Sequence, residues 1–414
     1  MPTINPDRLL TDLRTLRSIG AKERGVVRPA FSAADMEARR WLSQRYAEAG
    51  LEPLIDGVGN VLGRSRNSGK ALLIGSHSDT QPTGGWLDGA LGVICGLEIA
   101  RAFAEADETR HLAVDVASWS DEEGTFSGLL GSRSFVGEPV DAALQSAQNR
   151  GGQRLADALA AAGLADAPRV RVERGRYAGY LEPHIEQGGR LEASGKALGV
   201  VTTIVGLREL RVRFTGQRNH AGTTPMSIRR DAGAALVAFI ARMDEAFRAL
   251  ADADTVWTVG RIDLEPGSMS VVPGEASLYL QFRDSNAQRL QAMEAALAAL
   301  VREVDARGPV RAELSSVDEP MQPVTMDAAL QQHLARAAQA LAPGQWVSMP
   351  SGAAHDAQLI AQHMPACMLF VPSIGGVSHD FIEDTAEEHI VLGAQVAAAA
   401  AASILLEASA AAAR

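Results

Sequence analysis

The sequence has few cysteines, a deficit of positive charge and no evident export segment, and each of these excludes a class of protein. Only two of its 414 residues are cysteine, Cys95 and Cys367, which leaves no disulfide scaffold and no cysteine-rich zinc module. Any bound metal would therefore need histidine and carboxylate ligands. The net charge of −11 argues against a general nucleic-acid-binding protein, because such a protein needs a basic face to neutralise phosphates.

Targeting and membrane signals are also missing. Residues 1–20 carry charges throughout and lack the continuous apolar core of a signal peptide. We find no stretch of 18 apolar, uncharged residues, so we expect no membrane span. The alanine-rich tail over 395–413 is predicted to form a terminal helix. The sequence therefore predicts a soluble, cytoplasmic protein.

The first third of the chain alternates between helical and strand-like patterns. Apolar residues recur at helical spacing over 35–49 and 89–106, and buried strands are predicted over 71–74 and 111–119. This alternation predicts an α/β fold with a mostly parallel sheet covered by helices.

The middle of the chain follows a different order. Residues 207–214 alternate like a half-exposed strand. Helices are predicted there over 232–250 and 290–304, and strands over 256–262 and 276–282. After about residue 322 the first rhythm returns, with a helix over 328–342 and an apolar run over 368–371. We therefore predict a catalytic domain formed by residues 1–206 and 323–414. An inserted α+β domain with an antiparallel sheet interrupts it over residues 207–322.

Polar clusters follow the predicted strands, at the edge where parallel sheets bind ligands. Residues 77–79 (His-Ser-Asp) end one strand, and residues 121–123 (Asp-Glu-Glu) follow the next. His77 and Asp79 share a face of an extended segment, so the carboxylate can orient a ligating histidine. Asp88 is either a further ligand or an ordinary helix N-cap. The three adjacent carboxylates are either a solvated loop or held by positive charge.

Four more clusters contain histidine beside glycine or other polar residues. They are His184 to Gly188, His220 to Met226, Ser351 to Ala357 and Gly375 to His379. A single histidine is more often a hydrogen-bonded structural residue than a ligand. Six clusters that together hold five of the nine histidines favour a shared active site.

Seven blocks of sequence resemble one enzyme family in the same order. The blocks are GSHSDT, LDGALGV, SDEEGTFSGLLGSR, EPHIEQG, NHAGTTPMSIRRDA, SGAAHDA and GGVSHDFIE. They resemble the N-carbamoyl-L-amino-acid hydrolase and allantoate amidohydrolase branch of the di-metal aminoacylase/carboxypeptidase superfamily. His184 favours this branch, because the related peptidases and aminoacylases usually carry a carboxylate there.

The resemblance implies a centre of two divalent metal ions per subunit, zinc or alternatively manganese, cobalt or nickel. It assigns His77, Asp88 and His184 to one ion. It assigns Asp88, Glu123 and His379 to the second, so that Asp88 bridges the two.

The resemblance also implies catalytic and substrate-binding roles. Glu122 would be the general base, and Asp79 would orient His77. His220 would reach the active site of a partner subunit and stabilise the oxyanion, and Arg283 would bind the substrate carboxylate. Further substrate contacts are assigned to Gln187, His355 and Gly376.

Two departures from the family bear on the substrate. Leu207 stands where enzymes that act on allantoate carry glutamine, and Ser270 stands where they carry asparagine. Because both changes remove an amide that contacts the substrate, we expect a substrate other than allantoate, with a more apolar or acyl substituent. The alternative is that neighbouring residues supply the lost contacts.

The predicted function is hydrolysis of a non-peptide C–N bond in a small carboxylate-bearing substrate that contains an N-carbamoyl, ureido or N-acyl group. The enzyme would be a homodimer formed through the inserted domain, which would also act as a lid with hinges near Gly206 and Gln322. We expect no nucleic-acid or membrane partner. A metallopeptidase or aminoacylase is the first alternative, which His184 opposes. A non-catalytic binding protein is the second, which the intact ligand set and Glu122 oppose.

Overall fold

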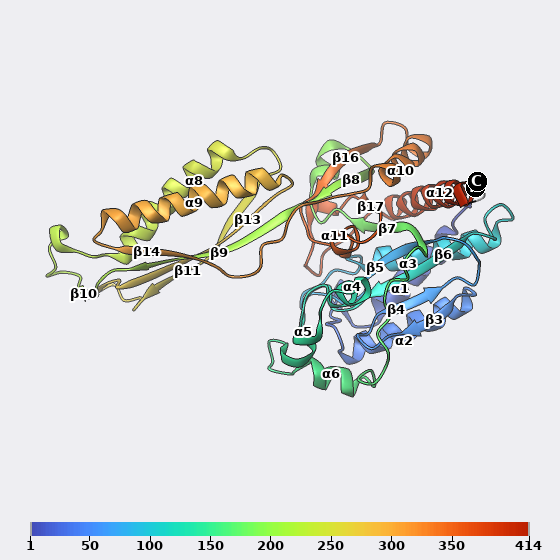
Figure 1. The fold of residues 1–414 in the computed structure, drawn as a ribbon, viewed down its shortest axis with the longest axis horizontal. Helices are drawn as coiled ribbons and strands as arrows, with labels where there is room; N and C mark the ends of the chain where they lie inside the picture. The colour runs from blue at the N-terminus through green and yellow to red at the C-terminus, as the bar shows by residue number, and fades with distance from the viewer. Residues whose placement is uncertain (1, 413–414) are drawn as a thin grey trace. The chain divides into compact units, whose positions relative to one another are not determined.

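The computed structural model describes residues 2–412 and divides into two compact units. Met1–Thr202 and Thr325–Arg414 form the first, named here the α/β unit, and Thr203–Val324 form the second, named the inserted unit (Figure 1). The domain boundaries expected from sequence, at 206/207 and 322/323, lie a few residues from these. Ala413, the last residue of the predicted terminal helix, lies outside the described residues.

The α/β unit is built on a nine-stranded mixed sheet in the order β15-β8-β17-β7-β5-β6-β4-β3, with β16 also paired to β8. The strands are β3 (Glu52–Ile55), β4 (Val61–Arg64), β5 (Ala71–His77), β6 (Ala113–Trp119), β7 (Tyr177–Ile185), β8 (Leu198–Ile204), β15 (Val324–Thr325), β16 (Trp346–Ser351) and β17 (Ala366–Val371). The central strands β17, β7, β5 and β6 are parallel, and every residue of β5 is buried, as expected for a strand covered on both faces. The predicted α/β fold with a mostly parallel sheet is confirmed.

Helices cover the sheet of the α/β unit. They are α1 (Pro6–Ser18), α2 (Ala33–Glu48), α3 (Ala90–Glu105), α4 (Leu130–Val136), α5 (Asp141–Ser146), α6 (Leu155–Ala161), α7 (Arg190–Ser194), α10 (Ala328–Leu341), α11 (Asp356–Ile360) and α12 (Glu387–Ala412). Side chains cap several of them; the Ser32 side chain, for example, accepts the Asp35 N–H at the start of α2. Glycine lets α3 approach the sheet, because a Cβ on Gly92 would lie 2.5 Å from the Pro183 carbonyl oxygen.

The alanine-rich tail that was predicted to form a terminal helix is part of α12. By length and composition alone this helix could cross a membrane, since residues 389–406 carry no charged side chain. In the structure, however, 67% of its apolar window is buried inside the protein. It packs against α3, α10 and the strands β7 and β17. The apolar character of α12 is therefore that of a core helix.

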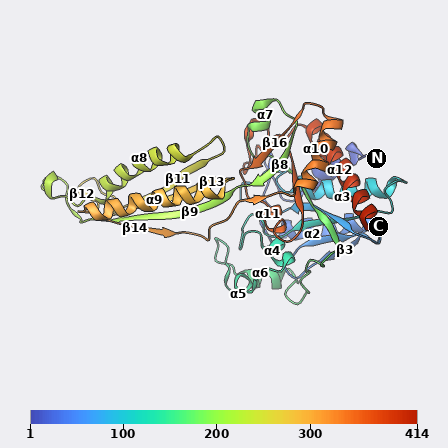
Figure 2. The ribbon, with the colours of Figure 1, turned by 45° about the horizontal axis from the view of Figure 1, so that its top comes forward.

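The inserted unit is a four-stranded antiparallel sheet, in the order β11-β13-β9-β14, with two long helices against it (Figure 2). Its main elements are β9 (Gly206–Thr215), α8 (Ala232–Leu250), β11 (Val256–Glu265), β13 (Glu275–Asp284), α9 (Ala287–Arg307) and β14 (Arg311–Ser316). The alternation seen in the sequence holds, because Leu210, Val212 and Phe214 of β9 face the helices in one apolar core.

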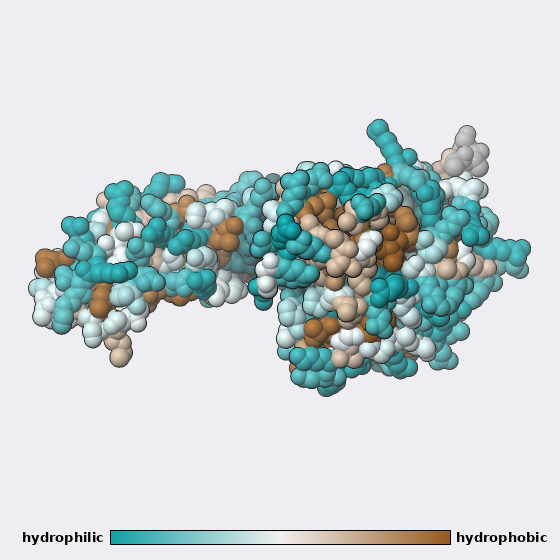
Figure 3. Space-filling model, turned by 90° about the horizontal axis from the view of Figure 1, so that it is seen from below, coloured by the Kyte–Doolittle hydropathy of each residue, from teal (hydrophilic) through white to brown (hydrophobic). Residues whose placement is uncertain are grey.

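Short elements and surface complete the description. The small pairs are β1 (Ala21–Lys22) with β2 (Gly25–Val26), and β10 (Asn219–His220) with β12 (Val271–Val272), and the 3-10 turns are η1 (Met226–Ile228) and η2 (Ile374–Gly376). On the face shown in Figure 3, apolar side chains gather in patches that hydrophilic residues surround.

Candidate metal centre

The α/β unit gathers the predicted metal ligands at the carboxyl ends of its parallel strands, where open α/β sheets bind ligands. The ligands are His77 at the end of β5, Asp88 before α3, Glu123 after β6, His184 near the end of β7 and His379 in the segment after β17, and the predicted base Glu122 directly precedes Glu123. The predicted cluster therefore exists as a single site in space.

The first group of donors surrounds one oxygen of Asp88. The Nε2 atoms of His77 and His184 lie 3.8 and 3.4 Å from Asp88 Oδ1. The three side chains are buried, and Asp88 Oδ1 accepts no hydrogen bond from any described residue. A buried carboxylate oxygen without a partner costs free energy, and a cation held by these three donors would remove that cost. The donor set therefore fits a divalent ion.

The second group uses the other oxygen of Asp88. His379 Nε2 lies 3.3 Å from Asp88 Oδ2 and 3.7 Å from Glu123 Oε2. These three residues also lie close enough together to hold a metal ion. Asp88 thus presents one oxygen to each group, which is the arrangement that a bridging carboxylate requires.

Hydrogen bonds fix the ring orientation of both buried histidines. The Nδ1 atoms of His77 and His184 lie 3.0 and 2.9 Å from the carbonyl oxygens of Asp79 and Ile185. An Nδ1–H that donates to a carbonyl leaves the Nε2 lone pair free for a metal. This tautomer of His184 agrees with the 3.3 Å contact in which its Nε2 accepts the Gly89 N–H.

Asp79 supports the site in a different way from the one expected. The prediction placed its carboxylate behind His77, but that carboxylate is 3.9 Å from Nδ1 and the main-chain carbonyl takes the position instead. The Asp79 carboxylate accepts the N–H groups of Glu122 and Glu123 at 3.4 and 3.2 Å. Asp79 therefore orients the segment that carries both glutamates as well as His77.

The pKa values of the carboxylates in this cluster are shifted from their usual values. Burial, and then the charge of Glu123, raise the pKa of Glu122 well above its usual value, and burial followed by the charge of Asp88 does the same to Glu123. Burial also acts to raise the pKa of Asp88, but a hydrogen bond from His379 and the charges of the histidines hold it well below its usual range. Perturbed pKa values of both signs in one cluster are typical of functional sites.

Glu122 is placed to act on a molecule beside the metal ligands. Its Oε2 atom lies 3.6 Å from His77 Nε2, and its side chain is 10% exposed. The group is largely buried and its pKa is raised, which is typical of carboxyl groups that accept and return protons in catalysis. This is the position expected of a general base.

Gln187 contacts the metal ligands. Its side-chain N–H donates to Asp88 Oδ2 at 3.0 Å and to Ser378 Oγ at 3.3 Å, and it lies 3.3 Å from His379 Nε2. The sequence prediction assigned it to the substrate. The structure shows in addition that it connects the Asp88 carboxylate to the segment that carries His379.

Three residues of the site have a left-handed backbone that side chains rarely adopt. They are Asp121, Gln187 and His379, with φ values of 53°, 57° and 56°. Each such non-glycine residue costs of order 1–3 kcal/mol, and such strain concentrates at functional sites. Gly89 has φ 65°, and a Cβ there would lie 2.5 Å from the His77 ring. Only glycine fits at that position.

Glu383 belongs to the site and was missed from sequence. It is 2% exposed, and its Oε1 accepts the N–H groups of Leu87 and Asp88 at 3.2 and 3.1 Å. Its Oε2 accepts the Ser378 hydroxyl at 2.7 Å. Glu383 therefore ties the segment of Asp88 to the segment of His379. Its position at the end of the GGVSHDFIE block is the only signal in the sequence.

Of the predicted substrate residues, His355 lies against the metal donors, and Gly376 lies against the segment that follows Gln187. The His355 ring is 2% exposed and meets the His184 ring edge-on, with centroids 4.5 Å apart. Its Nε2 pairs with Ser351 Oγ at 2.9 Å. Gly376 has φ 66°, and a Cβ there would lie 2.8 Å from Gly189 N. Glu182, His184 and His355 form a third group of potential metal donors, which the sequence analysis missed.

The remaining predicted residues lie in the inserted unit, where they form two pairs. Leu207 and Arg283 are direct neighbours across β9 and β13. His220 is on β10, and the next residue, Ala221, donates its N–H to the Ser270 carbonyl at 3.0 Å. Burial lowers the pKa of Arg283 from its ordinary value, and its Nε donates to Gln281 Oε1 at 3.0 Å.

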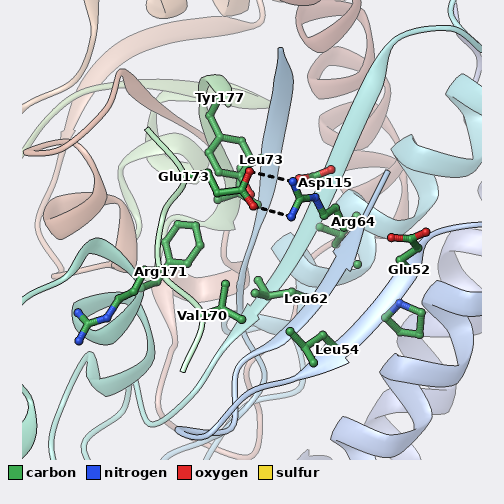
Figure 4. A pocket seen from close by; sticks show the side chains of 14 residues that line it. Glu52, Leu54, Leu62, Arg64, Leu73, Asp115, Val170, Arg171, Glu173 and Tyr177 are labelled. Atoms are coloured by element: carbon green, nitrogen blue, oxygen red, sulfur yellow. Dashed lines mark hydrogen bonds and ion pairs between the residues drawn. The ribbon is translucent and has the colours of Figure 1, made fainter. Parts of the chain in front are cut away.

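The α/β unit also has a cavity of about 500 Å³ that contains none of the predicted residues (Figure 4). It lies against β3, β4 and β6, with Leu62 and Phe135 in its wall and the paired side chains of Arg64 and Glu173 beside it. This cavity therefore lies away from the predicted site residues and does not mark the polar cluster described above.

Comparison with known proteins agrees with this centre. The fold and the cluster are those of a metal-dependent hydrolase, and the model of peptidase family M20/M25/M40 matches residues 73–403. The chain belongs to this family. It is 35% identical over 402 residues to an N-carbamoyl-L-amino acid amidohydrolase of Geobacillus stearothermophilus, and the matched region covers 95% of this chain and 97% of that protein.

Two further comparisons define the branch. An allantoate amidohydrolase of Bacillus subtilis is 33% identical over 381 residues, 89% of this chain and 90% of that protein. The crystal structure of an amidase of the hydantoinase/carbamoylase family from Burkholderia phymatum is 69% identical, with a TM-score of 0.94 and 99% coverage of both chains. The family predicted from the sequence blocks is confirmed.

Proposed function

We propose that this chain is a metal-dependent amidohydrolase that hydrolyses a non-peptide C–N bond in a small substrate bearing a carboxylate. The position of Asp88 carries the proposal, because its two oxygens face two separate histidine groups while Oδ1 lacks a hydrogen bond. The relatives named as N-carbamoyl-L-amino acid and allantoate amidohydrolases support an N-carbamoyl, ureido or N-acyl group as the group removed.

The proposed cofactor is a pair of divalent ions per subunit, zinc or alternatively manganese, cobalt or nickel. His77, Asp88 and His184 would hold one, and Asp88, Glu123 and His379 the other. Imidazole and carboxylate donors without a thiolate suit all four metals. When bound, the ions would supply a water of lowered pKa and polarise the scissile carbonyl.

Three side chains of the protein would transfer the proton, stabilise the developing negative charge and bind the substrate carboxylate. Glu122 accepts a proton from the attacking water and later returns it to the leaving nitrogen. His220, acting in the active site of a partner subunit, donates a hydrogen bond to the carbonyl oxygen as negative charge develops there. The Arg283 guanidinium binds the substrate carboxylate through two parallel hydrogen bonds.

The substrate-recognition residues favour a compound other than allantoate. Leu207 lies beside Arg283 across the strand pair, so an apolar wall adjoins the carboxylate-binding group. Ser270 has a shorter side chain and one fewer donor than the asparagine of allantoate enzymes. These residues, with Gln187, are therefore expected to accept a more apolar N-carbamoyl or N-acyl amino acid.

The proposed assembly is a cytoplasmic homodimer formed through the inserted unit. β11 is an edge strand of that unit, so one of its sides lacks a strand neighbour, and Val256, Ile262 and Leu264 on it are 51%, 47% and 44% exposed. A free strand edge with apolar side chains supports pairing with a second copy. Two buried, unpaired cysteines agree with a reducing compartment.

The test is hydrolysis of a panel of N-carbamoyl, N-acyl and ureido acids and dipeptides by metal-loaded enzyme. We expect N-carbamoyl or N-acyl amino acids to be hydrolysed faster than allantoate, and dipeptides to remain intact. Preferred hydrolysis of dipeptides would instead identify a metallopeptidase. Glu122→Gln should lower kcat by about 10²-fold or more while the metal content stays unchanged. Full activity of that variant with metal bound would refute the role of Glu122.

A further inference from the structure

The hydrogen bonds around His220 define the position of its ring proton. Its Nδ1 atom lies 3.0 Å from the Gly222 nitrogen and 3.1 Å from the Thr223 nitrogen, and both of these main-chain N–H groups donate to it. A main-chain N–H is a donor only, so Nδ1 has to be the acceptor. A neutral ring with an accepting Nδ1 carries its proton on Nε2.

The segment that follows His220 is itself held in place. The Thr224 hydroxyl donates to the His220 carbonyl at 2.6 Å, which closes the turn. Arg229 also holds the turn, because its Nε donates to the Thr224 carbonyl at 3.0 Å and its Nη2 donates to the Ala221 carbonyl. The two N–H groups that face Nδ1 are therefore fixed by contacts within the inserted unit.

Glycine at position 222 makes this close return of the chain possible. A Cβ on Gly222 would lie 3.3 Å from the His220 ring carbon Cε1, which is tighter than most such contacts. The imidazole itself is exposed, so burial does not hold the ring. Its orientation depends on the two N–H donors and on the turn that presents them.

We infer that residues 221–224 and Arg229 form a tautomer lock, which holds the His220 ring with Nδ1 as an acceptor and a proton on Nε2. The inference rests on the proposed function, in which His220 stabilises the oxyanion. A locked Nε2–H is a hydrogen-bond donor, so His220 acts by donation and cannot act as a general base through Nε2. Arg229 is then a positioning residue for catalysis, although it belongs to no metal or substrate contact described above.

The first test reads the tautomer directly in the full-length protein labelled with ¹⁵N-histidine. At a pH well above the ~6.5 at which imidazole titrates, we expect one His220 signal set, with Nε2 protonated and Nδ1 unprotonated. Comparison with His220→Gln assigns the signals. A protonated Nδ1, or a mixture of tautomers, would overturn the lock. This readout needs no activity, so it stands apart from the proposed function.

The second test compares two amides at the same position. A glutamine side-chain nitrogen reaches about as far as Nε2, whereas an asparagine nitrogen reaches only about as far as Nδ1. His220→Gln should therefore retain more kcat than His220→Asn, which should fall about 10²–10³-fold, the cost of losing an oxyanion donor. Equal loss in both variants would overturn donation from the Nε2 position. Full kcat in both would overturn the oxyanion role within the proposed function, whatever the tautomer.

The third test isolates Arg229. Arg229→Lys keeps the charge but cannot donate to the two carbonyls in the same fork, so we expect kcat to fall about 10-fold with KM and metal content unchanged. Arg230→Lys is the matched control, because it makes the same change on the adjacent, exposed residue and should leave kcat unaltered. A variant of Arg229 that matches this control, or that loses metal, would overturn the positioning role.

Discussion

Replacement of Glu383 by alanine is the sharpest test of how the metal centre is held together. The carboxylate accepts two main-chain N–H groups, from Leu87 and Asp88, and the Ser378 hydroxyl next to His379. Glu383→Ala removes the acceptors of all three at once. The bridging ligand and the His379 segment then lose the buried group that connects them.

The expected size of the effect follows from these contacts. Each buried N–H left without an acceptor costs about 1–3 kcal/mol of folding free energy, so the loss of stability should be about 2–6 kcal/mol. Loss of a residue that orients metal ligands lowers metal affinity by about 10–100-fold. Glu383→Gln should lie between wild type and alanine, since its amide oxygen can still accept from Leu87 and Asp88.

The assay is a competition titration of zinc or manganese against a chromophoric chelator, with thermal unfolding measured beside it. Glu98→Ala is the matched control, because Glu98 is equally buried and accepts three hydrogen bonds from Asn5 and Arg8, away from the metal centre. We expect both alanine variants to lose stability and only Glu383→Ala to lose metal affinity. Equal metal affinity in both variants would refute the reasoning, however much stability is lost.

The remaining predictions concern protons and backbone space at the same centre. A hydrogen bond to Asp88 raises the pKa of His379 to about 9, although burial opposes the shift. In the metal-free protein this group therefore stabilises the fold fully below the unfolded pKa of about 6.5, and the stabilisation is lost as the pH rises through about 9. Metal binding must expel that proton, so metal affinity should rise over the same range, and calorimetry in two buffers of different ionisation enthalpy should show proton release at pH 7; no dependence on buffer would contradict this. Gly89→Ala should lower metal content at least tenfold, since a Cβ would collide with the His77 ring, whereas Gly50→Ala has a similar positive φ with no neighbour within 4 Å and should lose only stability. Equal metal content in the two glycine variants would show that the collision has no effect.

The strand ends visible in the sequence predicted where the polar clusters lie, and the resemblance to the family then assigned ligands among them. His77 and the segment of Glu122 follow apolar runs, and parallel strands bring their carboxyl ends to one edge. The alternative for Asp88, an ordinary N-cap, is wrong: α3 has Gly89 as its N-cap and no side-chain cap hydrogen bond. A helix start and a ligand look alike in sequence, and only the orphaned oxygen of Asp88 separates them.

The three adjacent carboxylates, Asp121 to Glu123, have positions that the sequence pattern could not predict. The alternatives from sequence were a solvated loop or a group held by positive charge, but the three side chains have separate fates. The Asp121 carboxylate turns back to accept the N–H groups of Phe126 and Ser127, and burial raises its pKa to about 8. Only Glu122 and Glu123 reach the ligands. Asp121 has a positive φ, and backbone dihedrals of that kind leave no periodic trace in a sequence.

The contacts behind the ligands were the least predictable part, and the reason is physical. Glu383 acts on Asp88 across 295 positions of the chain, and Gln187 reaches the same residue across 99. Such contacts depend on how loops close over the strand ends, whereas a ligand such as His77 lies at the end of a strand that the sequence already indicates. The site also costs free energy of folding. Buried carboxylates at Asp88, Glu122 and Glu123 repel one another, and a fold tolerates this only where rigid neighbours hold them for a cation to neutralise.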